Sequence, residues 1–107
     1  MKKIKFQNSL VALVLSGEKT STWRLFDEKN LSVGDTINLV EFGKSDVFAQ
    51  AIITGVVQKK FKELTKTDKT GHETFFNDQE MYETYSRYYK TNVGPNTSLK
   101  IIWFELL

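Results

Sequence analysis

The stretch Ser16–Arg24, SGEKTSTWR, joins a predicted helix to a predicted strand. In the helix, the apolar residues between positions 10 and 15 form one face over about two turns. Asn8 or Ser9 is placed to cap its first turn. Gly17 is placed to end it, because glycine readily adopts the left-handed conformation found after helix C-termini. The stretch therefore predicts a helix, a tight turn and then a strand.

The strand is predicted for residues 21–26 and sorts its side chains onto two faces. Side chains two residues apart share a face, so Thr22 and Arg24 point together and Trp23 points to the other side. We expect Trp23 in the core, where large aromatic residues are usually buried. Lys19 lies in the turn after the glycine, where its side chain can bend towards Thr22. One hydroxyl, one ammonium and one guanidinium would then converge.

The spacing of Lys19, Thr22 and Arg24 is also compatible with ordinary surface residues that form no functional site. Lys19 would then be a solvated lysine near a helix C-terminus, where the dipole favours a cation. Thr22 would be an ordinary strand residue, and Arg24 would pair with Asp27 or Glu28. Strings of lysine, threonine and arginine are common in solvated segments.

Outside this stretch, alternation and turn residues predict four more strands, at 2–6, 36–42, 47–60 and 99–106. Gly55 interrupts the longest of them, which indicates a bulge or a barrel corner. The last is apolar on both faces, which predicts an interior position in the sheet. The fold class is therefore α+β: one domain, with a small mixed β-barrel of about five strands flanked by two or three helices.

The second half of the chain carries the remaining helical signals. Residues 61–64 are predicted to form one helical turn, and residues 65–74 a polar loop. Asn77 and Glu80 have the spacing of a capping box at the start of a late helix. Residues 92–95 are predicted to end that helix. Its tyrosines could stack on bases, but at helical spacing we expect them to pack.

The amino-acid composition limits the kinds of bond, metal site and ligand that we expect. The 107 residues contain no cysteine and one histidine, so we expect no disulfide, no metal site and no cofactor. The net charge of +2 tolerates an anionic ligand without the strong bias of a duplex-binding protein. No signal peptide or membrane span is recognisable, and we expect a cytoplasmic monomer.

The octet Gly17-x-Lys19-x-x-Thr22-x-Arg24 resembles the GxKxxTxR motif of the ASCH domain family. The turn at residues 33–35, Val-Gly-Asp, resembles a VGD turn of the same family, and the order of elements matches over nearly the whole chain. The resemblance implies a single ASCH domain at 1–107 with a barrel like that of the RNA-binding PUA fold. It further implies a cleft beside the motif that holds a nucleoside or RNA.

Small bacterial members of this family include amidohydrolases that deacetylate N(4)-acetylcytidine. In these enzymes the motif lysine and threonine act with a glutamate from the loop ahead of the late helix. The resemblance implies these roles for Lys19 and Thr22, with Glu73 as the glutamate and Glu63 as the fallback. The ligand contacts are expected from the motif residues Gly17 and Arg24 and from His72, which lies beside Glu73.

The roles within this set stay open. Thr22 is the hypothetical nucleophile, and Lys19 could take its proton only if neutral. A neighbouring Glu73 carboxylate would raise the pKa of the lysine, so the glutamate is either the proton acceptor or acts later on the leaving amine. Two alternatives use the same cleft without this chemistry: a non-catalytic RNA-binding module and an RNA-cleaving enzyme. A lone loop histidine such as His72 is more often a surface or hydrogen-bonding residue.

Overall fold

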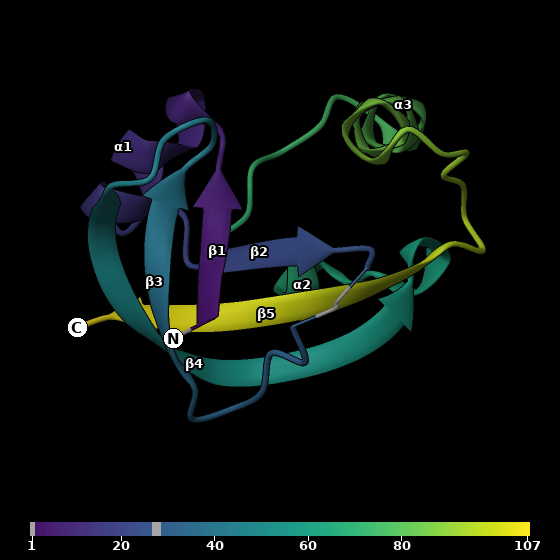
Figure 1. The fold of residues 1–107 in the computed structure, drawn as a ribbon. Coiled ribbons are helices and arrows are strands. Elements are labelled where there is room, and N and C mark those ends of the chain that lie inside the picture. Colours follow the sequence, from purple (N-terminus) through teal and green to yellow (C-terminus); the bar gives the residue numbers. More distant parts are fainter. Residues whose placement is uncertain (1, 27–28) are drawn as a thin grey trace.

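A computed structural model describes residues 2–26 and 29–107 of the chain. Five strands form one sheet in the order β1-β3-β4-β5-β2. Their bounds are β1 Lys2–Phe6, β2 Ser21–Arg24, β3 Thr36–Glu41, β4 Val47–Lys60 and β5 Ser98–Leu106. β1 and β3 are parallel and the other pairs are antiparallel. The sheet curls into a half-open barrel, which brings its two outer strands, β1 and β2, towards each other (Figure 1). The α+β class and the mixed barrel are thus confirmed.

Alternate residues of β5 enter two separate apolar clusters, as period-two geometry requires. Ile102 and Phe104 belong to the cluster that includes Val14 of helix α1. Leu99 and Ile101 belong to a second cluster that contains Trp23 and the buried face of helix α3. β5 lies between β4 and β2, which confirms its predicted interior position. Trp23 is 3% exposed, so its predicted burial is also confirmed.

Helix α1, Asn8–Ser16, ends as predicted but begins differently. Gly17 follows it in the left-handed conformation, with φ 84°, and its N–H donates to the carbonyl of Val14. The predicted caps Asn8 and Ser9 are wrong, since the N-cap is Gln7, which makes no side-chain cap bond. The Asn8 amide instead donates to the Glu41 carboxylate at 2.9 Å, a partner on β3 that the local sequence does not reveal.

The register of β4 against β5 shifts between Ile53 and Gly55, which confirms the break predicted at that glycine. The helical turn after β4 is a 3-10 helix, η1, at Phe61–Glu63. The segment predicted as a loop contains a further short helix, α2, at Lys66–Lys69. Thr65 and Asp68 form a reciprocal capping box at its start. Their spacing of three residues is a sequence signal for such a box, but it was not used in the prediction.

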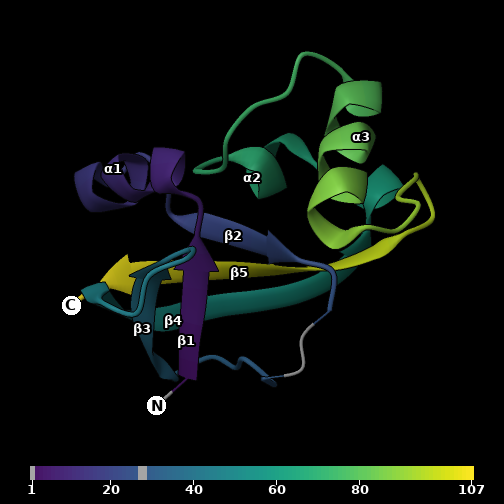
Figure 2. The same cartoon turned by 45° about the horizontal axis from the view of Figure 1, so that its top comes forward.

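Helix α3, Asp78–Tyr89, is capped by Asn77, whose side chain accepts from the Glu80 N–H at 2.8 Å. The reciprocal half of the predicted box is absent from the described residues, because the Glu80 carboxylate accepts from Phe76 instead. The helix ends at Tyr89, followed by Lys90 in the left-handed conformation with φ 52°, and not at the predicted residues 92–95. Figure 2 shows α3 standing apart from α1 above the sheet. None of the described helices has the length and apolar content needed to cross a bilayer.

Candidate functional site

A cavity of about 160 Å³ lies between the two outer strands and helix α3. Its lining comes from four segments that are distant in sequence. They are the end of β1 and the start of α1 (Lys5, Phe6, Gln7, Leu10), the turn and strand of the motif (Lys19, Thr22, Trp23, Arg24), the loop after α2 (His72, Glu73) and α3 (Tyr85, Tyr88, Tyr89).

Lys19 is the buried cation of this cavity, with only 3% of its surface exposed. The turn that Gly17 makes after α1 lets the Lys19 N–H donate to the Leu13 carbonyl at 3.0 Å, which directs the chain back over the helix end. The Lys19 ammonium then reaches the Glu73 carboxylate, with 2.6 Å between Nζ and Oε2. Its other side faces the Phe6 ring at 5.9 Å. The predicted meeting of Lys19 with a glutamate from the later loop is therefore present in the structure.

The loop that carries Glu73 is held against the start of β2 by one carbonyl. The carbonyl of Gly71 accepts from the N–H of Thr20 at 2.8 Å and from that of Ser21 at 3.2 Å. Gly71 has φ 76° and approaches Thr20 closely, so a side chain at this position would be strained and obstructed. Sequence reasoning missed the role of Gly71, although a glycine inside a polar loop is a signal for such a turn.

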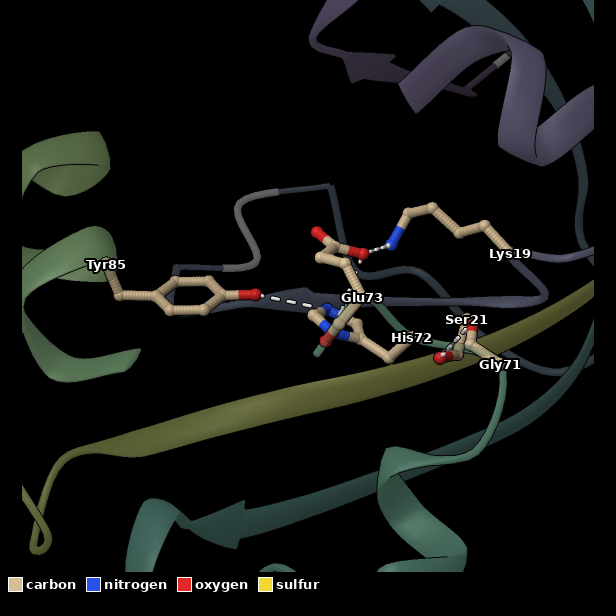
Figure 3. Close-up of polar contacts among 6 residues, drawn as sticks. All are labelled: Lys19, Ser21, Gly71, His72, Glu73 and Tyr85. Carbon is tan, nitrogen blue, oxygen red and sulfur yellow. Dashed lines mark hydrogen bonds and ion pairs between the residues drawn. The ribbon is translucent and has the colours of Figure 1, made fainter. Parts of the chain in front are cut away.

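His72 is packed between aromatic residues and does not lie on the surface. Its ring stacks on Trp23, with centroids 3.7 Å apart and an interplanar angle of 13°. Its Nδ1 lies 3.0 Å from the Glu73 carbonyl and its Nε2 lies 3.1 Å from the Tyr85 hydroxyl (Figure 3). A carbonyl can only accept, so Nδ1 carries the proton and the Tyr85 hydroxyl donates to Nε2. Both ring nitrogens of the neutral imidazole therefore have a hydrogen-bond partner.

The electrostatics agree with that protonation state. Burial, as the larger effect, and the nearby Lys19 charge lower the pKa of His72 to about 4, although Glu73 acts to raise it. Burial also lowers the pKa of Lys19, although the Glu73 charge and hydrogen bond act in the opposite direction. For Glu73, burial would raise the pKa, but the electrostatic effects of the His72 ring and the Lys19 ammonium, together with the hydrogen bonds, lower it below its ordinary value. At neutral pH the glutamate is therefore ionised and His72 is neutral.

Thr22 and Arg24 line the same cavity. Thr22 is 7% exposed, and its hydroxyl makes no hydrogen bond within residues 2–26 and 29–107. Trp23 also lines the cavity, so the strand does not divide cleanly into a site face and a core face. Asp27 and Glu28, the alternative partners considered for Arg24, lie outside the described residues.

Two of the residues expected at the site lie elsewhere. Gly17 does not line the cavity, and its structural contribution is the turn that positions Lys19. Glu63 does not line it either, and its carboxylate accepts from the backbone N–H of Lys60 at 2.7 Å. Sequence reasoning also missed Tyr85, which was assigned to packing. It is 4% exposed and packs as expected, but its hydroxyl also orients His72.

The described residues contain no group of three or more histidine, aspartate or glutamate side chains placed to hold a metal ion. Comparison with protein families finds that the model described as "ASCH domain" matches residues 1–107. No curated protein matches the chain.

Several solved structures have a similar fold. Protein EF3133 from Enterococcus faecalis V583 superposes with a TM-score of 0.76 at 21% identity, over 94% of this chain and 71% of that one. An ASCH domain from Lactobacillus crispatus JV V101 gives 0.70 at 15% identity, over 92% and 70%. Protein PF0455 from Pyrococcus furiosus gives 0.66 at 20% identity, over 99% and 96%.

Proposed function

The chain belongs to the ASCH domain family, and from this membership we propose that its cavity binds a nucleoside or RNA ligand and hydrolyses the amide of an acylated cytidine. The proposal rests on one observation: a partly buried ion pair between Lys19 and Glu73 in the cavity that Thr22 also lines. Such a pair gains less net stability than its attraction suggests, because Lys19 loses its hydration on burial. Perturbed charges in a cavity are typical of sites that bind or react.

The charge states support a division of roles. Glu73 is ionised at neutral pH and therefore able to accept a proton. Lys19, held 2.6 Å from that carboxylate, is suited to stay an ammonium that stabilises negative charge. Thr22 supplies the hydroxyl. We therefore favour Glu73 as the proton acceptor and Lys19 as the stabiliser of the oxyanion.

The proposed reaction has two steps. The Thr22 oxygen attacks the acyl carbon while Glu73 takes its proton, and the resulting oxyanion faces Lys19. The carbon–nitrogen bond then breaks, the exocyclic amine of cytidine leaves with the proton from Glu73, and the acyl group stays on Thr22. Water attacks this ester, and acetate leaves as the threonine hydroxyl regains a proton. The net change is amide plus water to amine plus carboxylic acid.

Cavity size supports a small substrate. Pockets for drug-sized ligands usually measure about 300–1,000 Å³, whereas this cavity measures about 160 Å³. A single base with a short acyl group is therefore a better match than several nucleotides enclosed together. A longer RNA would place only one base inside and leave the rest along the surface.

The first experiment measures acetate release from N(4)-acetylcytidine in the presence of a chelator. We expect turnover by the native protein and its loss in Thr22→Ala. Thr36→Ala removes an exposed hydroxyl outside the cavity and serves as the matched control. Full turnover in Thr22→Ala would exclude that residue as the nucleophile. A protein that releases no acetate but binds RNA with a steep salt dependence is a binding module, and loss of intact RNA would indicate a nuclease.

A second experiment separates Lys19 from Glu73 as the proton acceptor. Lys19→Arg keeps the positive charge but cannot act as a base near neutral pH. Substantial retained activity, with the pH–rate profile unchanged on its acidic limb, would agree with Glu73 as the acceptor. An activity lost in Lys19→Arg and equally in Lys19→Met would instead favour a neutral lysine base.

A further inference from the structure

The lining of the cavity carries more positive charge than its internal ion pair requires. Among the residues that the structure describes, three cations line it, Lys5, Lys19 and Arg24, against one carboxylate, Glu73. The Lys19 charge is already matched by that carboxylate at 2.6 Å. His72 adds no charge at neutral pH, because burial lowers its pKa to about 4. Two positive charges of the described lining therefore remain unmatched by a carboxylate of that lining.

The remaining two cations have no counter-ion within the described part of the chain. Neither Lys5 nor Arg24 forms an ion pair or a side-chain hydrogen bond with another residue described there. Other surface lysines do hold carboxylates at 2.6–2.9 Å, namely Lys2, Lys44 and Lys59. Within the described residues, Lys5 and Arg24 are thus available to a ligand that enters this cavity.

The two cations come from opposite edges of the sheet. Lys5 is on β1 and Arg24 is the last residue of β2, the two outer strands of the order β1-β3-β4-β5-β2. The curl of the sheet brings both edges towards each other (Figure 1), and residues from both line the same cavity. The half-exposed ring of Tyr88 lines the same space. Cations together with an exposed ring match a ligand that combines an anionic group with a planar base.

From this charge balance we infer that the cavity selects a phosphorylated ligand, a nucleotide or the phosphate of an RNA chain, over the neutral nucleoside. The inference rests on the proposed function, because it takes the base to be the group bound beside the ion pair. Arg24 is suited to the phosphate, since a guanidinium can donate two parallel hydrogen bonds to its oxygens. Lys5, which is exposed, adds a point charge at the rim.

The test compares affinities and does not depend on turnover. Cytidine, cytidine 5′-monophosphate and a short RNA without a terminal phosphate are each titrated against the full chain, with tryptophan fluorescence as the signal because Trp23 lines the cavity. We expect the monophosphate to bind about tenfold more tightly than cytidine at low salt, with the difference shrinking as salt is added. Tight binding of the short RNA assigns the phosphate to a chain, and weak binding assigns it to a mononucleotide.

Variants show which groups carry the selectivity. Arg24→Met should remove most of the preference for the monophosphate and Lys5→Met part of it, with Arg24→Lys intermediate. Lys3→Met is the control, because Lys3 is an exposed lysine two residues away on the same strand and does not line the cavity. Equal affinity for cytidine and its monophosphate, or no binding of either, overturns the inference. Acetate release from acetylcytidine, measured separately, shows whether the proposed function survives that result.

Discussion

Replacing Gly71 by alanine should destabilise the protein by about 2–5 kcal/mol. Two effects contribute. A side chain in the left-handed conformation, here φ 76°, costs roughly 1–2 kcal/mol. A Cβ at this position would also overlap the Thr20 hydroxyl oxygen and lie 3.3 Å from the Thr20 Cβ, and overpacking of this kind costs about 1–3 kcal/mol. The carbonyl bonds to Thr20 and Ser21 would then be strained or lost.

The two effects can be separated by a double-mutant cycle in urea unfolding. Thr20→Ala removes the overlapping hydroxyl from an exposed side chain and should cost little alone. In the Gly71→Ala/Thr20→Ala protein we expect the overlap to be relieved and about 1–2 kcal/mol to remain for the backbone conformation. A single-variant cost below about 0.5 kcal/mol, or no coupling between the positions, would refute this account of the loop. Since Glu73 lies two residues further on, Gly71→Ala should also weaken ligand binding.

The remaining predictions concern titration. The pKa of His72 is about 4 in the folded protein against 6.5 in the unfolded chain, so the unfolded state binds more protons between these values. The contribution of His72 to the free energy of unfolding should therefore be fully present above pH 6.5 and fall by roughly 3 kcal/mol as the pH approaches 4. In His72→Gln, the free energy of unfolding should depend less on pH across this range. An unchanged pH dependence in this variant would contradict the neutral state assigned to His72. Lys19→Met should raise the pKa of Glu73, because it removes a neighbouring charge and the 2.6 Å hydrogen bond. An NMR titration of the Glu73 carboxyl carbon measures this pKa. An unchanged pKa in the variant would show that the charges of Lys19 and Glu73 are not coupled.

Much of the site could be predicted because several of its residues lie close together in the sequence. The motif places Lys19, Thr22 and Arg24 within six residues, and the turn at Gly17 requires only a helix end and a glycine. The choice of Glu73 over Glu63 came from resemblance, and the contact at 2.6 Å spans 54 positions of sequence. No periodicity or capping rule reports a contact over that separation.

Two of the misses have a common cause. The N-cap at Gln7 was missed because Asn8 is held by Glu41, a residue on another strand. The role of Tyr85 was missed because helical spacing shows which face is buried but not what its hydroxyl meets. In both cases the partner of a polar side chain lies beyond the range of the local sequence pattern.

The sequence by itself determined most elements of this protein: five strands from their apolar patterns, the helix stop at Gly17, the break at Gly55 and the cap at Asn77. Each depends on neighbours within about one turn or one strand, whose conformational preferences act locally. Only the tertiary structure decided that the outer strands β1 and β2 share a cavity, and that one carbonyl of Gly71 holds the Glu73 loop beside Lys19. The physical reason is that sheet curl and long-range hydrogen bonds depend on the whole packed chain.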